Sequence, residues 1–124
     1  MNSKQIKLLS QIKRLVRLGN RRFANERRDR DYLDDLKKLR ITEDEAWEKY
    51  ILYLKPSDYV KDYKPSYYST PNTLVFKKLI KDNRAYIKLC VIEENGEKVL
   101  CLSFHIDHDR RDSYEMWYLW FNRN

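Results

Sequence analysis

Hydrophobic and polar residues alternate most regularly in the last third of the chain, on both sides of Asn95-Gly96. That dipeptide is typical of a type I′ hairpin turn, because both central residues of this turn need a positive φ angle. A two-residue loop pairs Glu94 with Glu97, and each pair further out keeps the same sum of residue numbers. The pattern therefore predicts an antiparallel hairpin in which Tyr86 faces His105.

This register sorts the side chains of the hairpin onto two faces. One face is wholly apolar and is predicted to be the core; its members are Ala85, Ile87, Leu89, Val91, Leu100, Leu102, Phe104 and Ile106. The other face carries Tyr86, Lys88, Cys90, Cys101, Ser103 and His105. A polar outer face is ordinary for an antiparallel sheet, but the grouping of a phenol, an ammonium, a hydroxyl and an imidazole makes this one a candidate reactive surface.

Helical periodicity dominates the first half of the chain. Apolar residues recur with helical spacing from Ile6 to Leu18, and Gly19-Asn20 ends this first helix. The charged stretch from Arg21 to Arg40 is interpreted as a second, solvent-facing helix. A capping box at Thr42–Glu45 opens a third helix, which Pro56 stops.

The elements that remain complete an α+β layout. A strand is predicted from Thr73 to Phe76, extending into Lys77 to Leu79, and Met116 to Phe121 is a last strand or a docking tail. Helices followed by a meander of strands predict N-terminal helices packed on a small antiparallel β-sheet. We expect a single domain over 1–124, mainly helical over 1–55, with the sheet over 73–106 and an extension over 107–124.

Composition narrows the range of partners. The 26 Lys and Arg outnumber the 19 Asp and Glu, for a formal net charge of +7, and there are ten tyrosines. Such a surface attracts RNA, since bases stack on aromatic rings while cations hold phosphates, and it attracts acidic proteins equally. No apolar run is long enough to cross a bilayer, so we expect a cytoplasmic protein without membrane contact.

The two cysteines predict neither a metal site nor a disulfide. Their spacing fits no zinc pattern, and no cofactor is expected. The register puts Cys90 opposite Cys101, but in a hydrogen-bonded pair, where the Cα atoms are farther apart than in the alternate pairs, and nothing else indicates an oxidising compartment. A metal nuclease built on His105, Asp107, His108 and Asp109 is the weaker interpretation, because alternate side chains along a strand point apart.

Four stretches, in order along the chain, resemble the MqsR family of type II toxin–antitoxin toxins. They are Ile12-Lys-Arg-Leu-Val16 with Gly19, Ser57-Asp-Tyr-Val-Lys61, Ala85-Tyr-Ile-Lys88 and Val99-Leu-Cys-Leu-Ser-Phe-His105. The resemblance implies a RelE-like fold, a ribosome-independent mRNA interferase activity and a cognate antitoxin partner. It also implies catalytic roles for Lys61, Tyr86 and His105.

The chain departs from the family pattern in three places. Thr73 or Leu74 stands where the family can show a glutamine, and His105 stands where its best-known form has a lysine. The extension over 107–124 runs beyond the family's short ending; it could cover the sheet edge, alter substrate access or form a homodimer.

Cleavage of RNA without a metal needs a base for the 2′-hydroxyl proton, a cation for the phosphorane and an acid for the 5′-oxygen. We assign His105 as general acid or base, because only its ordinary pKa lies near neutral pH, and Lys61 and Lys88 as phosphate-stabilising cations. Lys88 is alternatively a structural surface lysine, since lysines on sheet surfaces are commonly just solvated. Tyr86 would orient the phosphate or a base. Further RNA contacts are predicted for Ser103, Thr73, Tyr59 and Tyr63, the tyrosines either stacking on bases or anchoring the loop.

A different class of function explains the same basic surface. A non-catalytic nucleic-acid-binding module, or a degenerate toxin that only binds an acidic partner protein, needs no reactive centre. The two classes differ in whether Lys61, Tyr86 and His105 converge on one phosphate.

Overall fold

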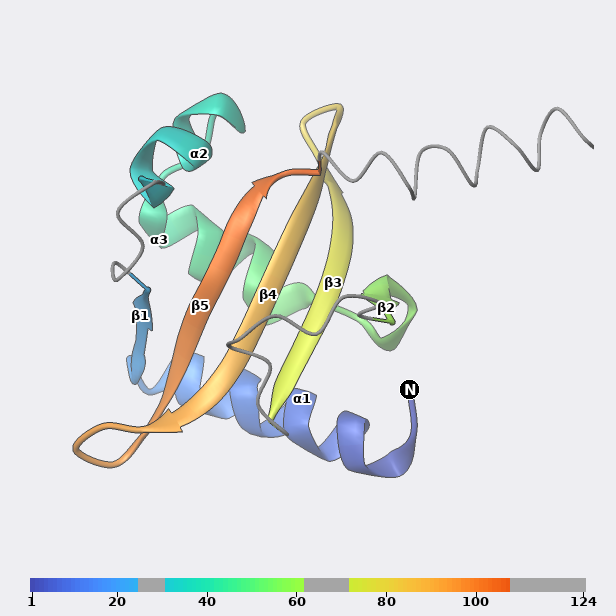
Figure 1. Ribbon diagram of the computed structural model, residues 1–124, viewed down its shortest axis with the longest axis vertical. Coiled ribbons are helices and arrows are strands. Elements are labelled where there is room, and N and C mark those ends of the chain that lie inside the picture. The colour runs from blue at the N-terminus through green and yellow to red at the C-terminus, as the bar shows by residue number, and fades with distance from the viewer. Residues whose placement is uncertain (25–30, 62–71, 108–124) are drawn as a thin grey trace, which may run out of the picture.

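A computed structural model of the protein describes residues 1–24, 31–61 and 72–107. These residues form an α+β fold with three α-helices beside one five-stranded sheet, in the order β1-β5-β4-β3-β2 (Figure 1). The elements are α1 (Ser3–Arg17), β1 (Arg21–Phe23), α2 (Tyr32–Lys38), α3 (Glu43–Glu45), β2 (Tyr59–Val60), β3 (Thr73–Ile80), β4 (Asn83–Glu93) and β5 (Glu97–Ile106). The predicted α+β class is confirmed, but the sheet is mixed, because β1 runs parallel to β5.

The first predicted helix is confirmed as α1. Asn2 and Gln5 form a reciprocal cap in which each side-chain oxygen accepts the other residue's backbone N–H, at 2.8 and 2.9 Å. Gly19, at φ +81°, follows the C-terminal cap, where a left-handed residue is tolerated best in glycine. The apolar stripe of the helix is buried, so its placement is set by packing on the sheet.

The second predicted helix is wrong over its first residues. Arg21–Phe23 form β1, which pairs with β5 from Arg21–Val99 to Phe23–Cys101, and among the described residues of this stretch only α2 is helical. Phe23 is buried, stacks on Tyr32 at 4.6 Å between ring centroids and meets Trp47 edge-on. These distant partners outweigh the local helical propensity of a charged stretch.

The third predicted helix begins as expected. Thr42 Oγ1 accepts from the Glu45 amide at 3.1 Å, and the Glu45 carboxylate accepts from the Thr42 amide at 3.0 Å. After α3 the chain continues as a wider π-helix over Ala46–Tyr50 and then as a tighter 3-10 turn over Ile51–Tyr53. A separate 3-10 turn begins at Pro56 and leads into β2.

The hairpin β4–β5 is confirmed, but the predicted register holds only for its outer half. Glu93 pairs with Glu97, so the loop has three residues rather than two, although Asn95 and Gly96 both have the expected positive φ. The inner pairs are therefore shifted by one residue until a β-bulge opposite Lys88 and Leu89 restores the predicted pairing. Beyond the bulge, Tyr86 pairs with His105 as predicted.

The bulge exchanges the faces of the inner part of β5. Val99 and Cys101 belong to the core cluster, whereas Leu100 does not, and Cys101 pairs with Leu89 rather than Cys90. Both cysteines are buried free thiols on opposite faces. This arrangement agrees with the expectation of no disulfide. The reason, however, is that the two thiols lie on opposite faces of the sheet.

The helices cover one face of the sheet, behind the strands in Figure 1, and the core lies between the two layers. Its largest fully buried side chains are Trp47, Phe76 and Phe104. In the three described ranges, no helix is long and apolar enough to span a membrane. The predicted strand or tail at Met116–Phe121 lies outside the described residues.

Candidate functional site

The sheet face turned away from the helices, here called the front face, carries two cross-strand rows of polar residues. Lys77 on β3 pairs with Tyr86 on β4, and Tyr86 pairs with His105 on β5. In the adjacent row Lys88 pairs with Ser103. Because directly opposed residues share a face, these five side chains project from one surface.

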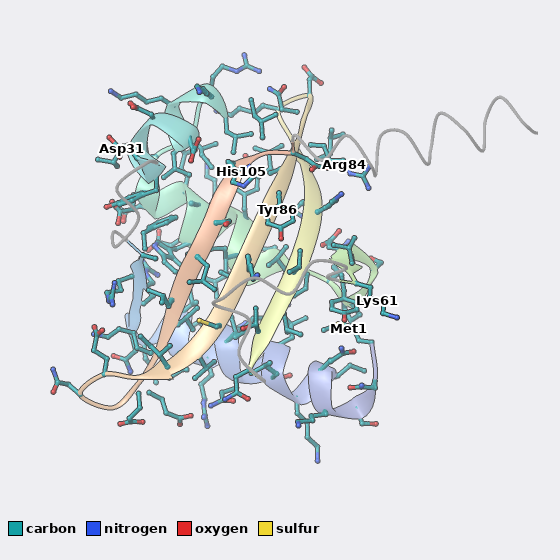
Figure 2. All side chains as sticks on the ribbon, in the orientation of Figure 1. Met1, Asp31, Lys61, Arg84, Tyr86 and His105 are labelled. Atoms are coloured by element: carbon teal, nitrogen blue, oxygen red, sulfur yellow. The ribbon has the colours of Figure 1, made fainter. Side chains whose placement is uncertain are left out.

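The Tyr86 and His105 rings are stacked at the centre of this surface. Their centroids lie 5.3 Å apart with 19° between the ring planes, and Figure 2 shows the two side chains together on adjacent strands. His105 Nδ1 lies 2.7 Å from the carbonyl oxygen of Ile106. A carbonyl only accepts, so this contact is a hydrogen bond in the forms of the ring that carry a proton on Nδ1.

Lys88 is more enclosed than an outer-face lysine should be. Only 5% of its surface is exposed, although its pairing places it on the front face beside Ser103. The front face also buries Val75 and Cys90, so it is not the fully solvated surface that the alternation predicts. A cation in such surroundings acts on a neighbouring anion with less screening than a solvated one.

The site also contains an ion pair that was not predicted from the sequence. It lies on the side nearer the turn between β3 and β4. Lys77 Nζ lies 3.1 Å from Asp107 Oδ2, with the side chains 6% and 5% exposed. Asp107 extends β5 by one residue, since its amide donates to the Arg84 carbonyl at 2.7 Å. A two-residue loop at Lys81-Asp82, where both residues have positive φ, gives the pairing of Lys77 with Tyr86. In the sequence this loop gives only a weak signal, because Lys81-Asp82 is not one of the usual dipeptides of a two-residue hairpin turn.

Lys61 is not brought into this group. It follows β2, the edge strand of the sheet, and Figure 2 shows it apart from Tyr86 and His105. At about 4.8 Å between neighbouring strands, β2 lies about 10 Å from β4 and about 14 Å from β5. The three predicted catalytic residues are therefore separated. Tyr86 and His105 lie together, and Lys61 lies at the far edge of the sheet.

The other predicted contacts are dispersed. Thr73 pairs with Cys90 on the front face, four residues along β3 from Lys77, or about 13 Å. Tyr59 pairs with Phe76, packs edge-on against its ring and accepts a 2.8 Å hydrogen bond from Gln5 Nε2. Tyr59 thus anchors β2 to the helix-covered side, as the structural alternative for the tyrosines expected. Tyr63 lies outside the described residues.

The thiols are poor nucleophiles. Burial raises the pKa of Cys90, with Lys88 and Arg22 opposing the shift through their charges. Burial also raises the pKa of Cys101, which lies in the core. Because the thiolate is the reactive form, neither cysteine is suited to covalent chemistry.

Within residues 1–24, 31–61 and 72–107, no group of three or more His, Cys, Asp or Glu side chains is placed to hold a metal ion. The ion pair with Lys77 occupies Asp107, the one described carboxylate of the suggested metal cluster. Comparison with protein-family models and with curated protein sequences finds no match. The interpretation of the site therefore depends on its own geometry and on the sequence resemblance.

Proposed function

We propose that this protein is the toxin of a type II toxin–antitoxin system, with an MqsR-like, RelE-like fold. It would cleave mRNA sequence-specifically, independently of metals and of the ribosome, with the 2′-hydroxyl as the nucleophile. The observation that carries the proposal is the stacked Tyr86–His105 pair beside the buried cation of Lys88. Its partners would be mRNA and a cognate antitoxin.

The residues divide the reaction among them. His105 Nε2 would take the 2′-hydroxyl proton or return one to the 5′-oxygen, because Nδ1 is held by a carbonyl. Lys88 would stabilise the charge that develops on the phosphorane, and Tyr86 would orient the phosphate or a base. Lys61, at the far edge, would hold a neighbouring phosphate of the bound strand.

The placement of Lys61 also favours a second candidate, a non-catalytic RNA-binding module. Binding needs only cations and aromatic rings along the strand, not their convergence on one phosphate. The ion pair with Asp107 further reduces the cationic charge that Lys77 could offer to a substrate.

The deciding experiment incubates purified protein with defined RNA and matched DNA in EDTA. We expect cleavage of RNA alone, leaving a 2′,3′-cyclic phosphate and a 5′-hydroxyl, with a rate about 10²- to 10⁴-fold lower in His105→Ala. Lys7→Ala, an exposed change on α1, is the matched control and should retain activity.

Two results would contradict the proposal. Intact RNA that is nevertheless tightly bound would establish the binding module instead. Equal cleavage by wild type and a folded His105→Ala variant would remove the site from the reaction.

A further inference from the structure

We propose that the Lys77–Asp107 ion pair is a positioning element that fixes the Tyr86 ring and sets the protonation balance of His105. The catalytic role of the pair rests on the proposed function. Its effect on the Tyr86 ring and on the protonation of His105 can be measured in the protein without substrate. Lys77 and Asp107 are positioning residues, because each acts through Tyr86 or His105 rather than on the substrate.

The pair crosses the strand that carries Tyr86. Lys77 is on β3 and Asp107 follows β5, so the ammonium and carboxylate meet across β4, at a distance of 3.1 Å. Tyr86 pairs with Lys77 on one side and stacks on His105 on the other. The phenol ring is therefore confined from β3, from β5 and from the end of the strands where the pair lies.

The Asp107 carboxylate also lies close enough to His105 to influence the charge of the imidazole. The two residues are separated by one position on the same face of an extended segment, which is about 7 Å between Cα atoms. A carboxylate at that distance favours the imidazolium, and the Lys77 ammonium cancels most of its effect. With both charges present, their opposite effects on the imidazole largely cancel.

Other charged groups lie on two of the elements that pack against β5. Arg84 and Lys88 are on β4 with Tyr86, and α2 carries the buried Asp35. These groups are unchanged in every variant below. A shift between variants then reports the Lys77–Asp107 pair alone.

The test is an NMR titration of the His105 imidazole, assigned from its loss in His105→Gln. Asp107→Asn leaves the lysine charge and should lower the titration midpoint, whereas Lys77→Met leaves the carboxylate and should raise it. We expect each shift to be about 0.5 to 1.5 pH units, from one elementary charge at that distance. Lys77→Arg preserves the pair and should restore the wild-type midpoint.

A single variant leaves one buried charge without its partner, which destabilises the fold. The double variant Lys77→Met, Asp107→Leu avoids this cost and tests confinement of the ring instead. In it, the upfield shift that the stacked Tyr86 ring imposes on the His105 protons should decrease. An unchanged upfield shift would show that the pair does not position Tyr86.

Midpoints that stay within about 0.2 pH units in both single variants would overturn the electrostatic role. If the wild type cleaves RNA, its pH–rate profile should move in the same directions as the titration. If it does not, the proposed function fails, while the titration still decides whether the pair controls His105.

Discussion

The two faces of the sheet are made from alternate residues of the same strands, yet they bury different kinds of side chain. The helix-covered face is apolar and closed, with Phe76, Ile87 and Phe104 all at or below 1% exposure. The front face buries charged lysines beside a stacked phenol and imidazole. From this difference we infer that the rigid packing of the helix-covered face holds in place polar groups on the front face whose burial costs free energy.

The largest expected effect is on the helix-covered face. Phe104→Ala should lower the free energy of unfolding by about 3–5 kcal/mol, because the ring leaves a cavity between sheet and helices. Ser103→Ala, the neighbouring change on the front face, should cost less than about 0.5 kcal/mol. Urea denaturation measures both, and equal losses would contradict the division between the faces.

The next effect tests the turn that sets the register of both faces. Gly96 has a φ of +100°, with nothing within 4 Å of an added Cβ, so Gly96→Ala would be penalised only by backbone strain. We expect a loss of about 1–2 kcal/mol in urea denaturation. Asn95→Gly is the matched change at the other positive-φ residue and should be neutral or stabilising; stability retained by both variants would argue against this turn geometry.

A smaller effect should appear in activity without appearing in stability. Tyr86→Phe keeps the ring that stacks on His105 but removes its hydroxyl, so under the proposed function RNA cleavage should fall about ten-fold. The free energy of unfolding should change by less than about 0.5 kcal/mol. Undiminished cleavage would limit Tyr86 to stacking.

The smallest effect concerns acid stability at the hairpin loop. A hydrogen-bonded ion pair with Arg22, at 2.8 Å, lowers the pKa of Glu94 from 4.5 to about 2, with Lys98 assisting. Because the folded value is the lower one, the contribution is present above pH 4.5 and is lost as the pH falls toward 2. Arg22→Gln should flatten this part of the stability–pH curve measured by urea denaturation. An unchanged curve would show that the exposed pair contributes nothing.

The sequence could predict the elements with strong local signals. The cap at Thr42 with Glu45, the end of α1 before Gly19 and the two strands of the hairpin each follow from a few neighbouring residues. The strand β1 could not be predicted in this way. Its three residues carry no strand pattern, and only pairing with β5 and burial of Phe23 make them a strand.

The candidate site was predicted through two errors that cancel. The loop has one residue more than the two-residue turn, and the bulge adds one residue to β5, so Tyr86 still faces His105. Neither feature has a local signal strong enough to be predicted, since a bulge depends on which register buries Val99 and Cys101. The Lys77–Asp107 pair depends on a further turn, at Lys81-Asp82, that lacks the usual Asn-Gly chemistry.

The parallel pairing of β1 with β5 also has a consequence for the order of events during synthesis. Arg21 leaves the ribosome long before Val99, its partner, so β1 cannot join the sheet until the chain has emerged past Val99. The stacked Tyr86–His105 pair depends on the same late strand. A nascent chain therefore carries no assembled site until β5 has emerged, and the proposed activity can begin only after His105 has left the ribosome.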